Sequence, residues 1–260
     1  MFMKKTIVII GAGKGLGNAV GKQFGKNGYR VALLARREEA LREYEAEFRA
    51  EGLEVYTHVA DAAEGDSLRA ALDWVQQEFG APDVVVYNVG NTTPDTADMS
   101  GEELVEHFRA DVAGAYDSAR LVATDEFAAK GGAIIFTGGG LALYPVHFYT
   151  PLSIDKAALR ALAYTLHEQL APRGIFVGTV TVCGTIGGDA YFAPARIAEA
   201  YWQLCAERQA CELIYTYPEQ AAERIFSPDG PFAAAGQSPA TATERCAMAF
   251  WGRNAEFARS

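Results

Sequence analysis

The sequence has few positive charges and no long apolar segment. Its 260 residues include 33 acidic and 23 basic side chains, which gives a formal net charge of −10. Because a phosphate-binding surface needs cations, this balance argues against nucleic acid or an anionic membrane as a partner. No apolar run approaches the ~18 residues of a membrane span, and residues 1–5 lead directly into a short apolar strand. Neither a membrane span nor a signal peptide is therefore predicted.

Cysteine is also scarce, and its placement matters more than its number. None of the cysteines belongs to a C-x-x-C pair. This usage fits reduced thiols in a cytoplasmic protein rather than a disulfide framework, and no metal site is predicted. The four cysteines are Cys183, Cys205, Cys211 and Cys246.

What the chain does contain is a glycine-rich turn close to its start. Residues 7–17 read IVIIGAGKGLG, an apolar run too short for a helix that passes directly into alternating glycines. Ala19, Val20 and Phe24 then follow at helical spacing. A strand, a glycine turn and a helix in this order hold a dinucleotide pyrophosphate. Backbone without Cβ atoms can approach phosphate, and the helix N-terminus offers free N–H groups.

Beyond this turn, short β-branched runs alternate with longer helical patterns. Residues 84–86 and 133–136 are apolar without alternation, as expected for strands buried on both faces. We therefore predict an α/β fold of the Rossmann type, with a doubly wound parallel sheet of about seven strands in a three-layer αβα arrangement. The predicted strands are 5–10, 30–35, 53–59, 83–87, 132–137, 174–181 and 211–215, and the predicted helices are 15–27, 38–51, 64–79, 101–129, 151–171 and 193–209.

The C-terminal residues have a different composition. Residues 216–240 contain four prolines and two glycines and are predicted to be irregular, whereas residues 241–251 could form a short helix. We assign residues 1–215 to one dinucleotide-binding and catalytic domain and residues 216–260 to an irregular extension of that domain. The extension is either a loosely held tail, a flap over the active site or a subunit contact.

The end of the second predicted strand indicates which dinucleotide is bound. Arg36 and Arg37 follow residues 30–35, where an NAD enzyme usually has an acid that accepts from the ribose 2′-OH. Guanidinium groups pair with a 2′-phosphate in a forked geometry, whereas a carboxylate would repel it. Lys14 adds a further cation within the glycine turn. These residues predict NADP(H), the alternative being that the two arginines are a solvated strand end.

The spacing of the glycines resembles that of one family. The fingerprint G-x-G-x-x-G would need glycine where Leu16 stands, whereas G-x-x-x-G-x-G fits Gly11, Gly15 and Gly17. This spacing resembles the short-chain dehydrogenase/reductase family, and the resemblance extends over residues 4–215. It implies that the turn, including Leu16 and the lysine within it, binds the cofactor phosphates.

Two further segments match the same family. Asp61 follows the third predicted strand, where the family has an aspartate that contacts the adenine. The segment YNVG, which contains Asn88 and Gly90, resembles the family's N-N-A-G beside the adenosine half of the cofactor. Asp61 could equally cap the helix that follows it.

The predicted active site departs from the family. Family members move a proton with a Ser–Tyr–Lys set supported by an Asn, because a free tyrosine (pKa about 10) donates poorly near neutral pH without a cation beside it. The segment LSIDKAAL resembles the family's Y-x-x-x-K-A-A-L, with Lys156 present and Leu152 at the tyrosine position. Gly138 and Gly139 stand at the serine positions and Asp111 at the asparagine position. The pattern resembles a divergent branch that keeps the cofactor half.

Four residues are therefore candidates for the chemistry. Lys156 would hold the nicotinamide ribose, and Asp111 would pair with this lysine and keep it charged. Tyr149 and His147 lie just before the same helix, at the expected substrate edge, and either could donate the proton. Both could instead be packing residues of a substrate loop.

These features predict an NADP(H)-dependent oxidoreductase that transfers hydride to or from a small carbonyl, imine or enone substrate. Two alternatives stay open: a protein that binds NADP(H) without turnover, as a sensor or subunit, and a non-redox enzyme on the same fold. Family members usually associate through two long helices, here residues 101–129 and 151–171. A homodimer or homotetramer is therefore expected.

Overall fold

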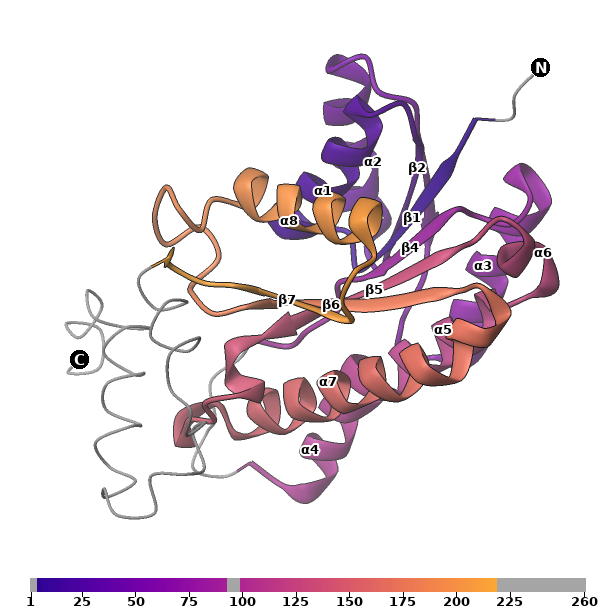
Figure 1. Ribbon diagram of the computed structural model, residues 1–260. Helices are drawn as coiled ribbons and strands as arrows, with labels where there is room; N and C mark the ends of the chain where they lie inside the picture. Colours follow the sequence, from indigo (N-terminus) through magenta and orange to yellow (C-terminus); the bar gives the residue numbers. More distant parts are fainter. Residues whose placement is uncertain (1–3, 93–98, 219–260) are drawn as a thin grey trace.

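The computed structural model describes residues 4–92 and 99–218 as a three-layer α/β fold (Figure 1). Its seven strands form one parallel sheet in the order β3-β2-β1-β4-β5-β6-β7, which confirms the predicted doubly wound Rossmann-type architecture. The strands are β1 (Thr6–Ile10), β2 (Arg30–Ala35), β3 (Val55–Val59), β4 (Val84–Tyr87), β5 (Ala133–Gly139), β6 (Phe176–Val182) and β7 (Glu212–Tyr215).

Helices cover both faces of this sheet. In Figure 1, α1, α2 and α8 lie on one side and α3, α5 and α7 on the other. The helices are α1 (Leu16–Lys26), α2 (Glu38–Ala50), α3 (Gly65–Phe79), α4 (Gly101–Phe108), α5 (Gly114–Val122), α6 (Asp125–Ala129), α7 (Thr150–Leu170) and α8 (Pro194–Glu207). One π-helical turn, η1 (Arg109–Ala113), and three 3₁₀ turns, η2 (Gly140–Ala142), η3 (His147–Tyr149) and η4 (Ala171–Arg173), complete the described elements.

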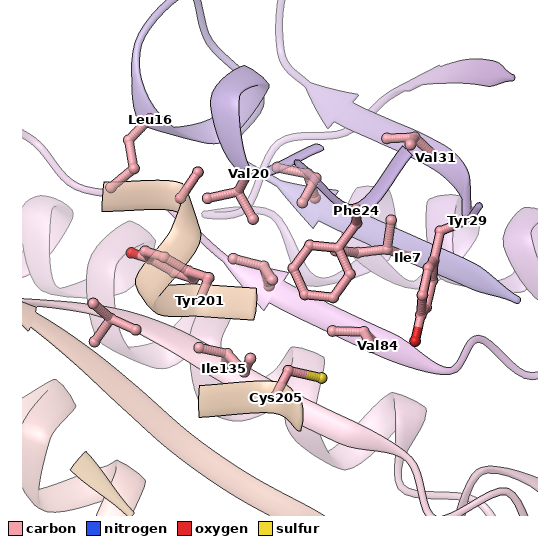
Figure 2. Packing of buried hydrophobic residues seen from close by; sticks show 14 of the residues in the cluster. Ile7, Leu16, Val20, Phe24, Tyr29, Val31, Val84, Ile135, Tyr201 and Cys205 are labelled. Atoms are coloured by element: carbon pink, nitrogen blue, oxygen red, sulfur yellow. The ribbon is translucent and has the colours of Figure 1, made fainter. Parts of the chain in front are cut away.

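The central strands are continuously apolar because each of their faces is buried in a separate core. Ile7 and Ile9 of β1 belong to the cluster under α1, α2 and α8, whereas Val8 and Ile10 belong to the cluster under α3, α5 and α7. Figure 2 shows the first cluster, in which Phe24 of α1 packs between the sheet and α8. The period of two in strand side chains thus distributes one apolar run between two cores.

The strand order places a topological switch beside β1. This strand pairs with β2 on one side and with β4 on the other, and Ile10 and Tyr87 stand opposite each other at the ends of β1 and β4. In open parallel sheets, ligands bind outside the carboxyl ends of the strands at such a point. The residues that follow β1 and β4 therefore define where the site lies.

The segment predicted as one helix over 101–129 is broken at two points. The π turn η1 separates α4 from α5, and a second break precedes α6. The Tyr87 hydroxyl donates to the carbonyl of Ala110 within η1, and Gly114 lies so close to the Ala62 carbonyl that no Cβ would fit. These contacts come from distant segments, so a local helical pattern could not indicate the break.

The other predicted elements match the structure with small differences at their ends. The helix expected over 241–251 lies outside the described residues, as does most of the extension expected over 216–260. Within the described ranges, no helix is long and apolar enough to cross a bilayer.

Candidate functional site

The glycine turn joins β1 to α1 at the carboxyl edge of the sheet. Gly11 has a φ of +86°, and a Cβ there would lie 2.8 Å from the carbonyl carbon of Asn88. A Cβ at Gly17 would lie 2.8 Å from the Gly11 carbonyl oxygen. By contrast, a Cβ at Gly13 or Gly15 would meet no protein atom within 4 Å. Packing therefore requires glycine at positions 11 and 17. Gly13 and Gly15 leave open backbone where a phosphate can approach the helix N-terminus.

A chain of hydrogen bonds holds this turn in place. The Asn88 side-chain Nδ2 donates to the Gly11 backbone carbonyl (3.0 Å), and the Thr137 hydroxyl of β5 donates to the Asn88 side-chain Oδ1 (2.9 Å). The Tyr201 hydroxyl of α8 donates in turn to the Thr137 hydroxyl (2.8 Å). Leu16 is the first residue of α1 and its side chain is buried in the core, so its backbone N–H is the group it offers to a ligand.

The cations predicted to bind a 2′-phosphate lie at the end of β2 and in the turn. Arg36 and Arg37 are exposed, and within the described residues neither guanidinium takes part in an ion pair or a hydrogen bond. Lys14 differs, because its ammonium lies 3.1 Å from the Glu43 carboxylate, with both side chains exposed. The two arginines therefore keep their charge available, while the lysine shares its charge with a carboxylate of α2.

Asp61 lies after β3, as predicted. One of its carboxylate oxygens accepts from the Ala63 N–H (3.0 Å), and its own N–H donates to the Ser67 hydroxyl (3.0 Å). The residue thus closes the turn that leads into α3. It is not the N-cap of that helix, which is Glu64.

Lys156 of α7 is buried beneath the strand ends. Its ammonium donates to the Thr137 carbonyl (2.9 Å), which uses one of its three N–H bonds, and no other described residue accepts from it. A Cβ at Gly90 would lie 3.2 Å from the Lys156 ammonium, and a Cβ at Gly139 would lie 3.3 Å from the Lys156 Cγ. Two glycines therefore line the space that the lysine occupies. Burial lowers the pKa of Lys156, and the carboxyls of Asp111 and Asp155 oppose this effect.

Asp111 lies in the π turn η1 and is almost fully buried. Its carboxylate accepts from the Asn91 N–H (3.0 Å), and burial raises its pKa against the opposing effects of Lys156, that hydrogen bond and His107. Among the ion pairs of the described residues, none joins Asp111 to Lys156. Both groups lie close to Gly90, where a Cβ would be 3.2 Å from the Lys156 ammonium and 3.9 Å from an Asp111 carboxylate oxygen, so the predicted pairing is an interaction through space rather than an ion pair in direct contact.

The structure adds one residue that the sequence patterns did not single out. Asp155 is 1% exposed, and neither carboxyl oxygen has a hydrogen-bond partner among the described residues. Burial raises the pKa of Asp155 to about 7, Asp111 adds to the rise, and Lys156 opposes it. Helical spacing could have indicated this position, because it lies on the apolar stripe that also contains Leu152 and Leu159.

The positions predicted to differ from the family's catalytic set are closely packed. Leu152 is buried in the first turns of α7. A Cβ at Gly138 would lie 2.6 Å from the Thr181 hydroxyl and 2.7 Å from the Thr179 hydroxyl, both in β6. The Lys156 side chain similarly crowds Gly139. The space around the family's serine positions therefore belongs to other side chains of this protein.

Tyr149 and His147 lie in the short turn η3 that leads into α7. Tyr149 is half-buried, whereas His147 is exposed and its ring packs edge-on against Phe148 with centroids 5.0 Å apart. The Ser153 hydroxyl accepts from the Val146 N–H (3.3 Å), which ties this loop to α7. Of the residues predicted to carry the chemistry, Lys156 and Asp111 are therefore buried, whereas His147 lies at the surface. Within the described ranges, no group of three or more acidic, histidine or cysteine side chains could hold a metal ion.

Comparison with known proteins shows the family of this chain. Residues 5–189 match the model of the short chain dehydrogenases. A 3-oxoacyl-[acyl-carrier-protein] reductase from Staphylococcus epidermidis is 27% identical over 180 residues, which cover 68% of this chain and 74% of the reductase.

Two solved structures share the fold. An alcohol dehydrogenase from the archaeon Thermococcus sibiricus, complexed with 5-hydroxy-NADP, is 26% identical with a TM-score of 0.70, covering 82% of this chain and 98% of that one. A metagenomic short-chain oxidoreductase in complex with NADP is 26% identical with a TM-score of 0.71, covering 81% and 96%. Because the family model spans most of the sequence and the sheet has the corresponding architecture, the chain belongs to the short-chain dehydrogenase family of oxidoreductases.

Proposed function

We propose that this protein is an NADP(H)-dependent oxidoreductase that transfers hydride to or from a small carbonyl, imine or enone substrate, without the family's usual serine and tyrosine. The observation that carries the proposal is the buried Lys156 ammonium at the carboxyl edge of the sheet. It keeps two N–H bonds that no described residue accepts, which suits a cation that holds a ribose hydroxyl. Gly90 and Gly139 leave the room that this lysine needs.

The residues around the glycine turn suit the phosphates of the cofactor. Open backbone at Gly13 and Gly15 and the N–H of Leu16 would receive the pyrophosphate, and Arg36 and Arg37 would pair with the 2′-phosphate. When bound, NADP(H) supplies or accepts the hydride. The NADP-type ligands of the two structural relatives support this choice.

The adenosine side would rest against residues after β3 and β4. Asp61 has one carboxylate oxygen engaged in its turn, which leaves the other for the adenine. Asn88 is committed to Gly11 and Thr137 and would act by positioning the glycine turn. Gly90 would act by making room for the lysine.

The group that gives the substrate its proton has two candidates in the proposed site. Tyr149 and His147 are the candidates from the sequence, and both lie in the turn next to α7. A half-buried tyrosine and an exposed histidine can both exchange protons with water. Tyr149→Phe and His147→Ala each remove one donor, and a retained rate and pH profile in both variants would exclude the pair.

A second candidate function is NADP(H) binding without turnover, as in a sensor or subunit. The specific observation in its favour is that the predicted tyrosine position is Leu152 and the predicted serine positions are Gly138 and Gly139. None of these side chains has a hydroxyl. A non-redox enzyme on the same fold would fit these losses too. Both alternatives predict that NADPH is not consumed.

We further propose that the chain forms a homodimer or homotetramer through α4, α5 and α7. Large apolar side chains are exposed on these helices, including Tyr116 and Tyr164. Burying them against a second copy would remove apolar surface from water. Tyr116→Glu is expected to reduce the molar mass measured by light scattering, whereas Tyr56→Glu on β3 is expected not to change it. The further exposed apolar residues of these helices are Val105, Phe108 and Ile154.

The deciding experiment measures NADPH consumption with a panel of carbonyl, imine and enone compounds. Wild type is expected to turn over at least one class, and Lys156→Ala is expected to abolish that activity. Arg42→Ala, which removes an exposed arginine of α2, serves as the control. Tight NADPH binding with no consumption on any panel member would favour the binding protein instead.

A further inference from the structure

Thr137 lies near the carboxyl end of β5 and is hydrogen-bonded through both its backbone and its side chain. Its backbone carbonyl accepts from the Lys156 ammonium (2.9 Å), and its hydroxyl donates to the Asn88 side-chain Oδ1 (2.9 Å). The Asn88 Nδ2 donates in turn to the Gly11 backbone carbonyl (3.0 Å). One buried residue therefore contacts both the lysine of α7 and the side chain that holds the glycine turn.

The direction of each hydrogen bond in this chain follows from the groups themselves. The Gly11 carbonyl can only accept, so the Asn88 amide must turn its Nδ2 toward that oxygen and leave Oδ1 for Thr137. Oδ1 can also only accept, so the Thr137 hydroxyl must give its single hydrogen to Asn88. The hydroxyl of Tyr201, 2.8 Å from the Thr137 oxygen, must then be the donor in the remaining bond.

Tyr201 of α8 is the first donor of the chain and is fixed in the core. Its side chain is fully buried in the cluster beneath α1, α2 and α8, within which Figure 2 labels it. Burial raises the pKa of the Tyr201 hydroxyl, so the group stays protonated near neutral pH and continues to donate. The next residue, Trp202, packs edge-on against Phe24 of α1 with ring centroids 5.1 Å apart. The tyrosine thus donates from a helix that is itself packed against α1.

The orientation of the Asn88 amide matters because the Gly11 carbonyl lies against the first turn of α1. A Cβ at Gly17 would lie 2.8 Å from that oxygen and 3.0 Å from the Asn88 Nδ2. A reversed amide would bring Oδ1 to the Gly11 oxygen, and two acceptors at this distance repel each other. The glycine turn would lose its partner and its shape. The hydroxyl that keeps the amide in its present orientation is that of Thr137.

We propose that Thr137 and Tyr201 are positioning residues for the cofactor, which act on the glycine turn through the Asn88 amide. This inference rests on the proposed NADP(H)-binding function. The Tyr201 hydroxyl orients the Thr137 hydroxyl, which fixes the amide. The amide then holds the Gly11 carbonyl, so that the open backbone of the turn keeps the shape that receives the pyrophosphate.

The first test measures cofactor binding to the full chain by fluorescence titration and needs no turnover. Thr137→Val keeps the shape of the side chain but removes the donor to Asn88. It is expected to raise the Kd for NADPH and for NADH by about tenfold each, because the turn binds the part that both cofactors share. Thr137→Ser keeps a hydroxyl and is expected to recover most of this loss. An unchanged Kd in Thr137→Val would overturn the proposal.

The second test asks whether the tyrosine acts through the threonine. Tyr201→Phe is expected to raise both Kd values by about threefold, since the Thr137 hydroxyl loses its donor but can still reach Asn88. The double variant is expected to bind as weakly as Thr137→Val alone, because the effect of Tyr201 passes through the missing hydroxyl. Losses in binding free energy that add in the double variant would contradict this order.

A matched control separates positioning from a general loss of stability. Tyr215→Phe removes a hydroxyl that donates to the Tyr191 backbone carbonyl (2.7 Å), outside the chain that leads to Gly11. Urea denaturation is expected to show a lower midpoint for both Tyr215→Phe and Tyr201→Phe, whereas only Tyr201→Phe is expected to bind the cofactors more weakly. Equal weakening of binding in both variants would show that stability alone sets the affinity.

Turnover adds a further readout. With any substrate that wild type reduces, the KM for NADPH is expected to rise about tenfold in Thr137→Val while kcat falls less than about threefold. The reason is that valine keeps the backbone carbonyl that accepts from Lys156. If wild type binds neither cofactor, the proposed function fails and this inference fails with it. If wild type binds NADPH and Thr137→Val binds it equally well, only this inference fails.

Discussion

The glycine turn after β1 and the first half of α7 lie at the same edge of the sheet and are held in different ways. Backbone contacts hold the turn, since Gly11 and Gly17 fit against the neighbouring chain with no room for a Cβ. Buried charges dominate α7, where Lys156 makes one hydrogen bond and Asp155 makes none among the described residues. We therefore expect phosphate binding at the turn to depend on its shape, and any reaction beside α7 to depend on buried charge.

The comparison explains how one region can keep the family pattern while the other changes. A glycine that touches backbone has few tolerated replacements, because strain and overlap penalise every side chain. A proton donor can be replaced by any group that holds a proton at the working pH. The predicted differences at Leu152, Gly138 and Gly139 are therefore compatible with a glycine turn that keeps the family spacing.

The largest expected effect separates two glycines of the turn. Gly11→Ala combines a positive φ with a Cβ 2.8 Å from the Asn88 backbone, so we expect the free energy of unfolding to fall by about 5 kcal/mol. Urea denaturation measures this change. Gly13→Ala has open space around its Cβ and is expected to unfold like wild type while binding NADPH about tenfold more weakly. Equal stability of the two variants would contradict the distinction between the packed Gly11 and the open Gly13.

The next effect concerns the buried carboxyl of Asp155 and is expected within a defined pH window. The pKa of Asp155 is about 7 in the folded protein and about 3.9 unfolded, so the folded state holds a proton that the unfolded state loses as pH rises from 4 to 7. The contribution of Asp155 to wild-type stability therefore decreases over this window. Asparagine cannot ionise, so Asp155→Asn is expected to gain up to about 4 kcal/mol over wild type at pH 8 and nothing at pH 4. A pH-independent difference in urea midpoints would contradict this account.

A smaller effect is expected at the end of β2. Arg36→Ala combined with Arg37→Ala removes two guanidinium groups that have no partner among the described residues. We expect the Kd for NADPH to rise about 10- to 100-fold while NADH binding stays near the wild-type value, because only NADPH carries the 2′-phosphate. Fluorescence titration measures both constants, with Arg42→Ala as the control. An equal loss for both cofactors would show that the arginines act on the shared part of the molecule.

The smallest effect is expected from restoring the family's tyrosine. Leu152→Tyr places a phenol four residues before Lys156, but in the proposed function another group, with Tyr149 and His147 as candidates, already supplies the proton. We expect kcat to change by less than about threefold, whereas a missing general acid is worth about 10²-fold or more. A rise of that larger size would show that wild type lacks an effective donor.

The sequence was sufficient for the architecture because the strands are defined locally. Residues 7–10 and 84–86 are short apolar runs between turns, which is the pattern of strands buried on both faces. The π turn within 101–129 was not predictable in this way, since it depends on Tyr87 and Gly114 meeting distant backbone.

The candidate site was predictable in part. The structure brings Lys156 and Asp111 close to Gly90, and the roles assigned to these residues stay predictions. The burial of Asp155 could have been inferred from its helical spacing with Leu152 and Leu159, but its lack of described hydrogen-bond partners is visible only in the structure. Lys14 carries a charge in the motif, but its ion pair with Glu43 joins separate elements and has no local signal.

The central claim is that the cofactor end of this protein functions although its reaction end has been altered. A fluorescence titration of the wild-type protein with NADPH and with NADH tests it most directly. The account predicts saturable binding of both, with NADPH at least about tenfold tighter because Arg36 and Arg37 pair with its 2′-phosphate. NADH binding as tight as or tighter than NADPH binding, or no saturable binding of either, would contradict it.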